Sequence, residues 1–295
     1  MTFIDLNFRG HQRVIASAVL QGPDGIALVD PGPTSCLPAL EAGLAGLGLG
    51  LGDVRALLLT HIHLDHAGAA GTIVSRVPGV EVYVHERGAP HMVDPAKLLA
   101  SATRLYGDQM DTLWGRFDPV PASAVRPLAG GETVTVARRP FRVAYTPGHA
   151  KHHVSYLDEA DGTAYVGDTG GIRVSHDYLL APTPPPDIDL EAWEASLQLL
   201  EAWSPVRLFL THFGPTGNAL THLGRYRETL ARTAALVRDT LGGEGEDEAR
   251  ITRFTEALRA DVRQAMPETD AVATELAAPF DQLWQGLARY WRKRE

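Results

Sequence analysis

The chain has 295 residues, of which 44% are hydrophobic, and its formal net charge at pH 7 is -9. This length and apolar content allow a substantial buried core, in one large domain or in a domain with an appendage. The acidic balance argues against a nucleic-acid partner, because phosphate binding draws on clustered Lys and Arg side chains.

The chain contains one cysteine, Cys36, so an intramolecular disulfide is excluded. That composition suits a reducing compartment. The N-terminus lacks a basic region followed by an apolar core, and no apolar stretch approaches the ~18 residues of a membrane span. We therefore expect a cytoplasmic protein without a membrane partner.

The first part of the chain predicts alternating strands and helices. A hairpin is expected around the Gly-Pro-Asp-Gly turn at residues 22–25, and an Ala, Gly and Leu-rich helix follows it. The expected strands are 14–20, 26–29, 55–59 and 80–84, and the expected helices are 37–49 and 67–77. This alternation is typical of a layered α/β fold.

The segment 86–126 interrupts the alternation. It includes an expected helix at residues 95–113, and its aromatic residues Tyr106, Trp114 and Phe117 suggest a flap over a site. Its length is more than a plain connection needs.

The second half returns to strands and then becomes helical. Strands are expected at 133–136, 141–146, 154–157, 164–166 and 206–210, with a helix from Asp189 to about residue 203. From residue 218 the apolar spacing is helical, with a break at 242–246. We predict a catalytic domain over residues 1–217, including the insertion, and a helical C-terminal region over 218–295.

A cluster of metal-binding side chains follows the strand at residues 55–59. His61 and His63 are two residues apart, so in an extended backbone both rings project to the same side and can bind one ion. Asp65 and His66 follow as the chain turns toward a helix. Surface histidines are a poor explanation for this spacing.

Three later strands are each followed by a further candidate ligand. These ligands are His149, Asp168 and His212. Each position alone is weak evidence, but ligands from distant sequence positions converge at one edge of an α/β sheet. Together they predict a metal site.

Five segments resemble the signature of the metallo-β-lactamase-fold hydrolases. They are residues 28–32 (Leu-Val-Asp-Pro-Gly), 60–68 (Thr-His-Ile-His-Leu-Asp-His-Ala-Gly), 146–149 (Thr-Pro-Gly-His), 167–168 (Gly-Asp) and 211–212 (Thr-His). The resemblance implies an α/β fold, a four-layer αβ/βα sandwich with metals at one edge, to which this chain would add a helical insertion and an α-helical C-terminal appendage.

The resemblance also implies two metal ions. His61, His63 and His149 would hold one ion, Asp65, His66 and His212 the other, and Asp168 would bridge them. This division is chemically reasonable, since a shared carboxylate offsets the repulsion between two dications. Zinc is the expected metal, with iron or manganese as alternatives, and a metal-bound hydroxide would be the nucleophile. Asp65 and Asp168 are therefore also the expected catalytic residues.

Two further residues are expected to support the ligands. Asp30 occupies the position of a buried acid that orients the metal site in the family, although it could simply cap the turn before Pro31. His153 matches the Pro-Gly-His-x-x-x-His pattern of glyoxalase-II-like members. The other nearby histidines, His152, His85, His91 and His176, are expected to be exposed or ordinary surface residues.

The expected reaction is hydrolysis of a small-molecule thioester or ester. The glyoxalase-II-like (hydroxyacylglutathione hydrolase-like) branch has the most similar layout, including helices after the last histidine. The insertion is longer than in those enzymes, and no glutathione-binding set of basic residues is matched, although Arg173 and Lys151 lie near the corresponding loops. Asp168 weighs against a true β-lactamase, since the zinc β-lactamases of this fold lack the bridging carboxylate.

Several alternatives remain. A lactonase is the second choice, but the tyrosine expected shortly after the bridging aspartate is absent. A phosphodiesterase acting on RNA is disfavoured by the acidic charge. A persulfide dioxygenase of similar motif would bind a single iron, and a non-catalytic binding module would leave the ligand set unexplained. A small molecule is the expected partner; the oligomeric state stays open, a homodimer included.

Overall fold

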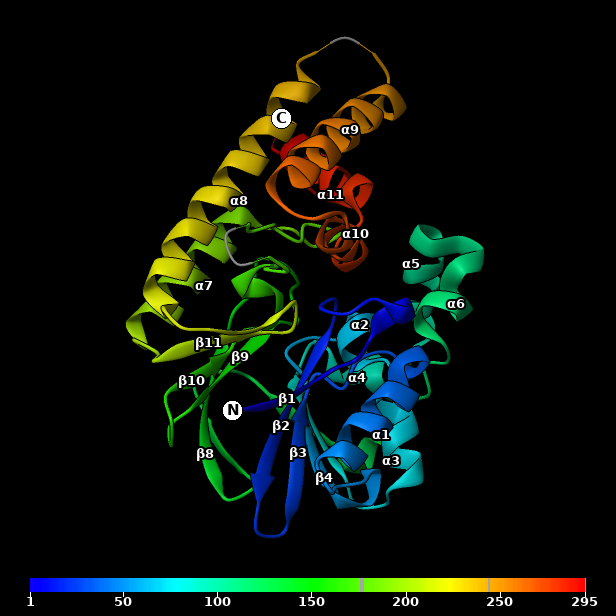
Figure 1. The fold of residues 1–295 in the computed structure, drawn as a ribbon, viewed down its shortest axis with the longest axis vertical. Coiled ribbons are helices and arrows are strands. Elements are labelled where there is room, and N and C mark those ends of the chain that lie inside the picture. The colour runs from blue at the N-terminus through cyan, green and yellow to red at the C-terminus, as the bar shows by residue number, and fades with distance from the viewer. Residues whose placement is uncertain (176–177, 244, 295) are drawn as a thin grey trace.

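The computed structural model describes residues 1–175, 178–243 and 245–294; His176 lies outside them. Two six-stranded mixed sheets form the centre of the molecule (Figure 1). The first sheet has the order β1 (Thr2–Asp5), β2 (Ala16–Gly22), β3 (Gly25–Val29), β4 (Val54–Leu58), β5 (Glu81–His85) and β6 (Val125–Leu128). Its strands β3 to β6 are parallel, as βα alternation requires.

The second sheet is mostly antiparallel. Its order is β12 (Gly214–Thr216), β11 (Arg207–Leu210), β10 (Thr163–Tyr165), β9 (Val154–Asp158), β8 (Arg139–Tyr145) and β7 (Thr133–Val136). Only β10 and β11 are a parallel pair among these strands. The short strands β1, β6 and β12 were not expected from the sequence.

The two sheets pack face to face. Side chains alternate along each strand, so that one set fills the space between the sheets and the other faces outward. Ala56 and Leu58 of β4 belong to the inner cluster with Phe141, Tyr156 and Phe209 of the second sheet. The intervening Leu57 belongs to the outer core.

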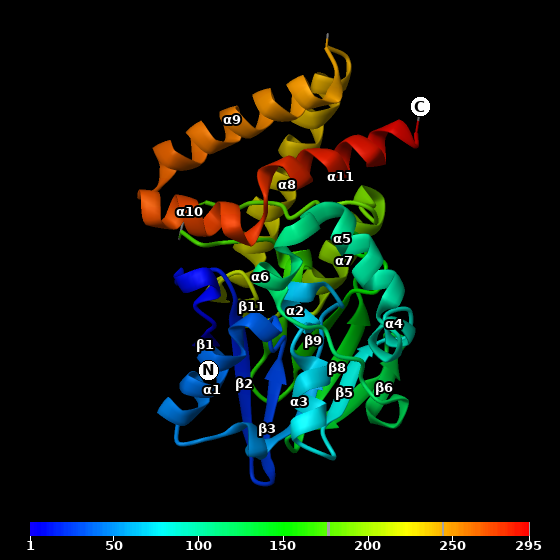
Figure 2. The ribbon, with the colours of Figure 1, turned by 90° about the vertical axis from the view of Figure 1, so that its right-hand side faces the viewer.

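Helices cover the outer faces. α1 (Leu37–Gly46) and α3 (Ala70–Arg76) lie outside the first sheet (Figures 1 and 2). α7 (Leu190–Ala202) packs Trp193 and Leu197 in the same apolar cluster as Leu208 of β11. The four-layer αβ/βα arrangement is thus confirmed.

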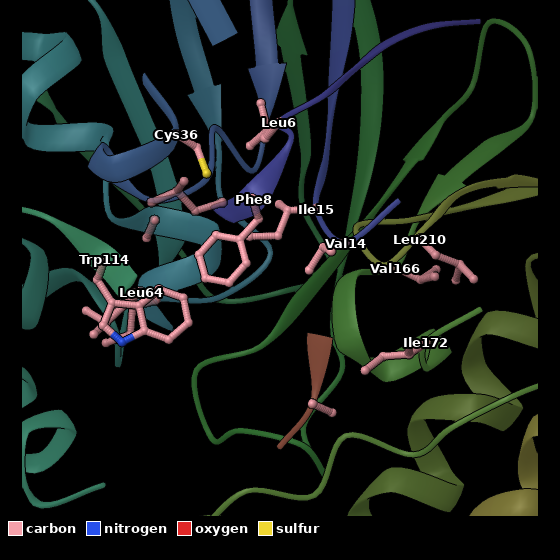
Figure 3. Close-up of a cluster of buried hydrophobic side chains, with 14 of the residues drawn as sticks. Leu6, Phe8, Val14, Ile15, Cys36, Leu64, Trp114, Val166, Ile172 and Leu210 are labelled. Atoms are coloured by element: carbon pink, nitrogen blue, oxygen red, sulfur yellow. The ribbon is translucent and has the colours of Figure 1, made fainter. Parts of the chain in front are cut away.

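The insertion forms three short helices rather than one long one. They are α4 (Ala89–Val93), α5 (Ala96–Tyr106) and α6 (Met110–Trp114). The predicted single helix over 95–113 is wrong, because the chain turns at Gly107 with a φ of +53°, which a helix cannot accommodate. The indole of Trp114 stacks on the ring of Phe8, with centroids 5.5 Å apart, which anchors α6 on the N-terminal segment (Figure 3).

The C-terminal region is helical, as expected. It contains α8 (Ala219–Leu241), α9 (Asp247–Ala265), α10 (Glu268–Ala277) and α11 (Phe280–Arg292). Helix α8 runs away from the sheets, α9 runs back toward them, and α10 lies nearer to the sheets than α9 does (Figure 2). No helix in the described ranges is both long enough and apolar enough to cross a bilayer.

Candidate metal centre

The first group of candidate ligands lies between β4 and α2 (Leu64–Ala67). β4 is buried on both faces and ends at Leu58, and the chain then runs irregularly to His63, which precedes the helix with a φ of -61° and a ψ of 153°. Asp65 and His66 lie within α2. The turn from strand to helix therefore places all four side chains at one end of the first sheet.

The remaining candidates come from the second sheet. β8, β10 and β11 all run in the same direction, because β9 is antiparallel to both β8 and β10 and because β10 and β11 are parallel. His149, Asp168 and His212 follow the carboxyl ends of these three strands. They meet the first group where the sheets join, at a hydrogen bond from Val154 N to Thr60 O of 2.8 Å.

Three sets of side chains are close enough to share an ion. In each set the candidate ligand atoms lie within 4.8 Å of one another, and the sets are His61, His63 and His149; His61, His66 and Asp168; and Asp65, His66 and His212. The structure thus brings together all seven residues predicted as metal ligands.

Asp168 lies between the two outer sets. Its Oδ2 atom is 3.4 Å from Nε2 of His149, whereas its Oδ1 atom is 3.3 Å from Nε2 of His66 and 3.6 Å from Nε2 of His212. The two oxygens of one carboxylate therefore face opposite sides of the site, which is the arrangement that a bridging ligand requires.

Three of the histidines are oriented through their second ring nitrogen. Nδ1 of His149 is 2.8 Å from Pro182 O, Nδ1 of His212 is 2.6 Å from Val14 O, and Nδ1 of His66 is 2.8 Å from Asp30 Oδ2. When Nδ1 carries the proton in these bonds, Nε2 is left with its lone pair directed into the site.

The residues fit divalent metal ions. Among the described residues, the Nε2 atoms of His61, His66 and His212 and the Oδ1 atom of Asp168 are buried without a hydrogen-bond partner. Buried polar atoms are rarely left unpaired, so four in one cluster call for a ligand that accepts their lone pairs. Imidazole and carboxylate donors suit zinc, iron and manganese.

The first set is electrically neutral. Burial lowers the pKa of His61 well below its ordinary value, and the neighbouring imidazoles lower it further. Burial also lowers the pKa of His63 to about 4 and lowers that of His149. Neutral imidazole is the form that binds a metal ion, because protonation removes the lone pair.

The candidate ligands around Asp168 and His66 carry the negative charge of the site. Burial disfavours the ionised form of Asp168, but the imidazoles of His149, His66 and His212 outweigh it and hold the pKa well below the ordinary range. Burial likewise disfavours protonated His66, but the carboxylates of Asp65, Asp168 and Asp30 raise its pKa. These carboxylates therefore make the surroundings of His66 favourable for positive charge, as a cation site requires.

Asp30 accepts hydrogen bonds from four groups. Its Oδ1 atom accepts from Thr60 N at 2.8 Å, and its Oδ2 atom accepts from Thr60 Oγ1 at 2.8 Å, Thr211 Oγ1 at 2.7 Å and His66 Nδ1 at 2.8 Å. These bonds support a role in orienting His66 rather than in capping the following turn.

His153 packs against the candidate ligands. Its ring is stacked on that of His61, with centroids 5.0 Å apart, and its Nδ1 atom is 3.0 Å from Thr146 Oγ1. Two expectations about other histidines are wrong. His152 is half-buried beside His63, and His85 at the end of β5 is buried and stacked on Tyr145 at the end of β8.

The family model described as the Metallo-beta-lactamase superfamily matches residues 12–212, more than half of the chain. The chain belongs to the metallo-β-lactamase superfamily. All seven candidate ligands fall within the matched residues. The C-terminal helices α8 to α11 all lie beyond them.

Two curated relatives illustrate the range of this superfamily. A metallo-beta-lactamase fold-containing protein of Sulfurisphaera tokodaii is 30% identical over 145 residues, covering 48% of this chain and 54% of the relative. A hydroxyacylglutathione hydrolase of Synechococcus is 30% identical over 151 residues, covering 51% of this chain and 47% of the relative. The matches thus span about half the length of these relatives.

Solved structures of the superfamily share the fold. A protein from Sulfolobus tokodaii superposes with a TM-score of 0.70 at 20% identity over 97% of both chains. One from Thermus thermophilus gives 0.69 at 24% identity, over 95% of this chain and 89% of that one. A third, crystallised in a di-iron-bound form, gives 0.52 at 28% identity over 74% of this chain and 92% of that one.

A cavity of about 240 Å³ adjoins the metal centre. His63, Asp65, His149 and Asp168 line one side, and residues of α5, of the proline-rich loop 182–186 and of the turn between α10 and α11 line the rest. Gln282 of α11 was not identified from the sequence. No local motif marks it, because only the folding of the C-terminal helices brings it to the site.

Proposed function

We propose that this protein is a dinuclear-metal hydrolase that cleaves a small-molecule thioester or ester. The observation that carries the proposal is the position of Asp168, whose two carboxylate oxygens face the two ligand sets separately. Members of each set lie close enough to bind the same ion.

In this proposal the ligands divide as the sequence predicted. His61, His63 and His149 would hold one divalent ion, and Asp65, His66 and His212 would hold the other, with Asp168 shared. When bound, such ions polarise a carbonyl oxygen and lower the pKa of water at the site.

The chain itself supplies position and environment. Asp168 is held as a carboxylate by three imidazoles, so it offsets positive charge without taking up a proton. Asp30 keeps the Nδ1 proton of His66 directed away from the site. Burial of these side chains excludes bulk water, which strengthens their electrostatic effect on a substrate carbonyl.

The comparisons support the reaction class more than the substrate. One matched relative is named a hydroxyacylglutathione hydrolase, but the match covers 47% of its length. A structural neighbour at 28% identity binds two irons. We propose zinc as the resident metal, with iron as the alternative, and a small-molecule substrate.

The test combines metal analysis with a substrate panel. The purified protein should contain about two metal ions per chain and should hydrolyse members of a panel of thioesters, esters and lactones that includes S-lactoylglutathione. The Asp168→Ala variant should lose both the second ion and the activity. Turnover no greater than that of this variant would remove the hydrolase proposal, and one iron with oxygen consumption would favour the dioxygenase alternative.

A further inference from the structure

The cavity beside the metal centre has apolar walls contributed by four distant parts of the chain. Leu98, Ala102 and Leu105 come from α5, Leu283 comes from α11, and Ile62 and Leu64 flank the ligand His63. Pro182, Pro184, Pro185 and Pro186 complete the lining with further apolar surface.

Two helices close over this cavity and contact each other. The hydroxyl of Tyr106 at the end of α5 donates a hydrogen bond of 3.3 Å to Oε1 of Gln282 on α11. Both residues line the cavity, as Asp168 does. The insertion and the C-terminal region therefore build one wall of the cavity jointly.

Positive charge is scarce at the cavity. Among its lining residues, within the described chain, Lys97 is the only lysine or arginine, and its side chain lies on an exposed face of α5. Lys151, one of two residues near the loops that bind glutathione in related enzymes, pairs at 3.2 Å with Asp187, which itself lines the cavity.

Arg173, the second residue near those loops, also interacts with a group outside the cavity. Arg173 does not line the cavity, and its guanidinium donates to the backbone oxygen of Pro215 at 2.5 Å. An anionic tripeptide such as glutathione needs cationic or hydrogen-bonding partners for its two carboxylates. Lys97 gives the cavity one lysine or arginine for two such carboxylates, and most of the remaining lining is apolar.

We propose that this cavity binds an apolar chain attached to the scissile ester or thioester group. The inference rests on the proposed hydrolysis and narrows its substrate to an uncharged chain, on either the acyl or the leaving-group side, in place of glutathione. The driving force is removal of the chain from water, which contributes about fourfold in affinity for each buried CH2 group.

The first test measures kcat/KM along two substrate series with the metal-loaded protein. One series lengthens the acyl group of a methyl thioester from acetyl to dodecanoyl, and the other lengthens the thiol of an S-alkyl thioacetate over the same range. In at least one series, kcat/KM should rise about fourfold per CH2 until the cavity is filled. A flat or falling profile in both, or a preference for S-lactoylglutathione, would overturn the inference.

The second test fills the cavity. Ala102 is 8% exposed and lines the cavity from α5, so Ala102→Phe should move the optimum to a shorter chain. Ala100→Phe is the matched control, because Ala100 is exposed on the same helix and does not line the cavity. Identical chain-length profiles for the two variants would contradict the proposal. Ala102→Leu repeats the comparison with a smaller side chain should the phenylalanine variant fail to fold.

A binding measurement separates this inference from the hydrolase proposal. The dye N-phenyl-1-naphthylamine, which fluoresces in apolar sites, is bound to the protein and displaced with the neutral alcohols 1-butanol and 1-decanol. The decanol concentration that displaces half of the dye should be at least tenfold lower for the wild type and Ala100→Phe than for Ala102→Phe. If this result is obtained but no substrate is turned over, the apolar binding site is supported and the hydrolase proposal is rejected. If decanol does not displace the dye, the apolar binding site is rejected.

Discussion

The Oδ2 atom of Asp30 lies 2.8 Å from the Nδ1 atom of His66, and neither side chain is exposed. Asp30 follows the end of β3 with a φ of 50°, a left-handed conformation that ends the strand. The same carboxylate accepts from Thr60 beyond β4 and from Thr211 beyond β11. One side chain thus links both sheets to a candidate metal ligand.

Replacing Asp30 should weaken metal binding. Asp30→Asn preserves the shape of the side chain but replaces one acceptor oxygen with an NH2 donor, which faces groups that themselves donate. His66 then loses the partner that fixes its ring, and we expect about a 10-fold to 100-fold loss of zinc affinity. Competition against a chromophoric chelator measures the change.

The control for this prediction is Asp24→Asn. Asp24 is an exposed carboxylate whose ion pair with Arg138 lies at the surface, 2.8 Å long, where such pairs contribute little. The zinc affinity of the Asp24→Asn variant should equal that of the wild type. Unchanged affinity in Asp30→Asn as well would show that His66 does not depend on the carboxylate.

Removal of metal should lower the stability of the whole protein. Dialysis against a chelator leaves the lone pairs of His61, His66 and His212 buried without a partner. Metal present at about a thousand times its dissociation constant stabilises the folded state by about 4 kcal/mol, so the Tm should fall on removal and recover with added zinc. His149→Ala should show a smaller difference between the two conditions. An identical Tm with and without metal would count against a metal centre.

The site could be predicted from sequence because its residues follow local rules. His61 and His63 come directly after an apolar strand, and His149, Asp168 and His212 each follow another strand. Strand ends of one orientation gather at one edge of a sheet, so the order of these segments was enough to bring them together. The positions of the ligands that follow strands of the second sheet could therefore be predicted without knowing how distant parts of the chain pack.

The walls of the cavity could not be predicted in the same way. Tyr106 and Gln282 meet through a hydrogen bond between residues 176 positions apart, and neither belongs to a motif. The helix break at Gly107 was missed because a single glycine inside an apolar helical pattern is usually tolerated. His152 was misjudged because its burial depends on neighbouring elements rather than on its own segment.

Gly167 should not tolerate a side chain. A Cβ atom there would lie 2.5 Å from Thr60 Oγ1 and 2.8 Å from His153 Nε2, at a φ of +45°. Gly167→Ala should therefore displace the turn that holds Asp168 and cost both metal affinity and about 3 kcal/mol or more of stability, to be measured by urea unfolding.

Gly48→Ala separates steric overlap from backbone strain. Gly48 has a φ of +74°, but a Cβ atom there would meet nothing within 4 Å. Strain alone should cost about 1 kcal/mol to 2 kcal/mol and leave metal affinity unchanged. Equal losses in the two variants would mean that contact with Thr60 and His153 does not restrict position 167.

His222 should make the protein less stable as the pH falls. Burial lowers its pKa from 6.5 to about 4, and its Nε2 atom donates to Gly170 O at 2.8 Å. Because the unfolded chain then binds a proton that the folded protein does not, the contribution of His222 is complete above pH 6.5 and is lost as the pH falls from 6.5 toward about 4. At about pH 5 the loss is about 2 kcal/mol.

His222→Gln isolates this effect, because glutamine can still donate to Gly170 O but does not titrate. Urea unfolding at about pH 7.5 and about pH 5 should show that the variant loses about 2 kcal/mol less stability between the two conditions than the wild type does. His11→Gln removes an exposed histidine on the N-terminal segment and should retain the wild-type pH dependence. Equal losses in wild type and His222→Gln would show that His222 does not stay neutral in the folded protein.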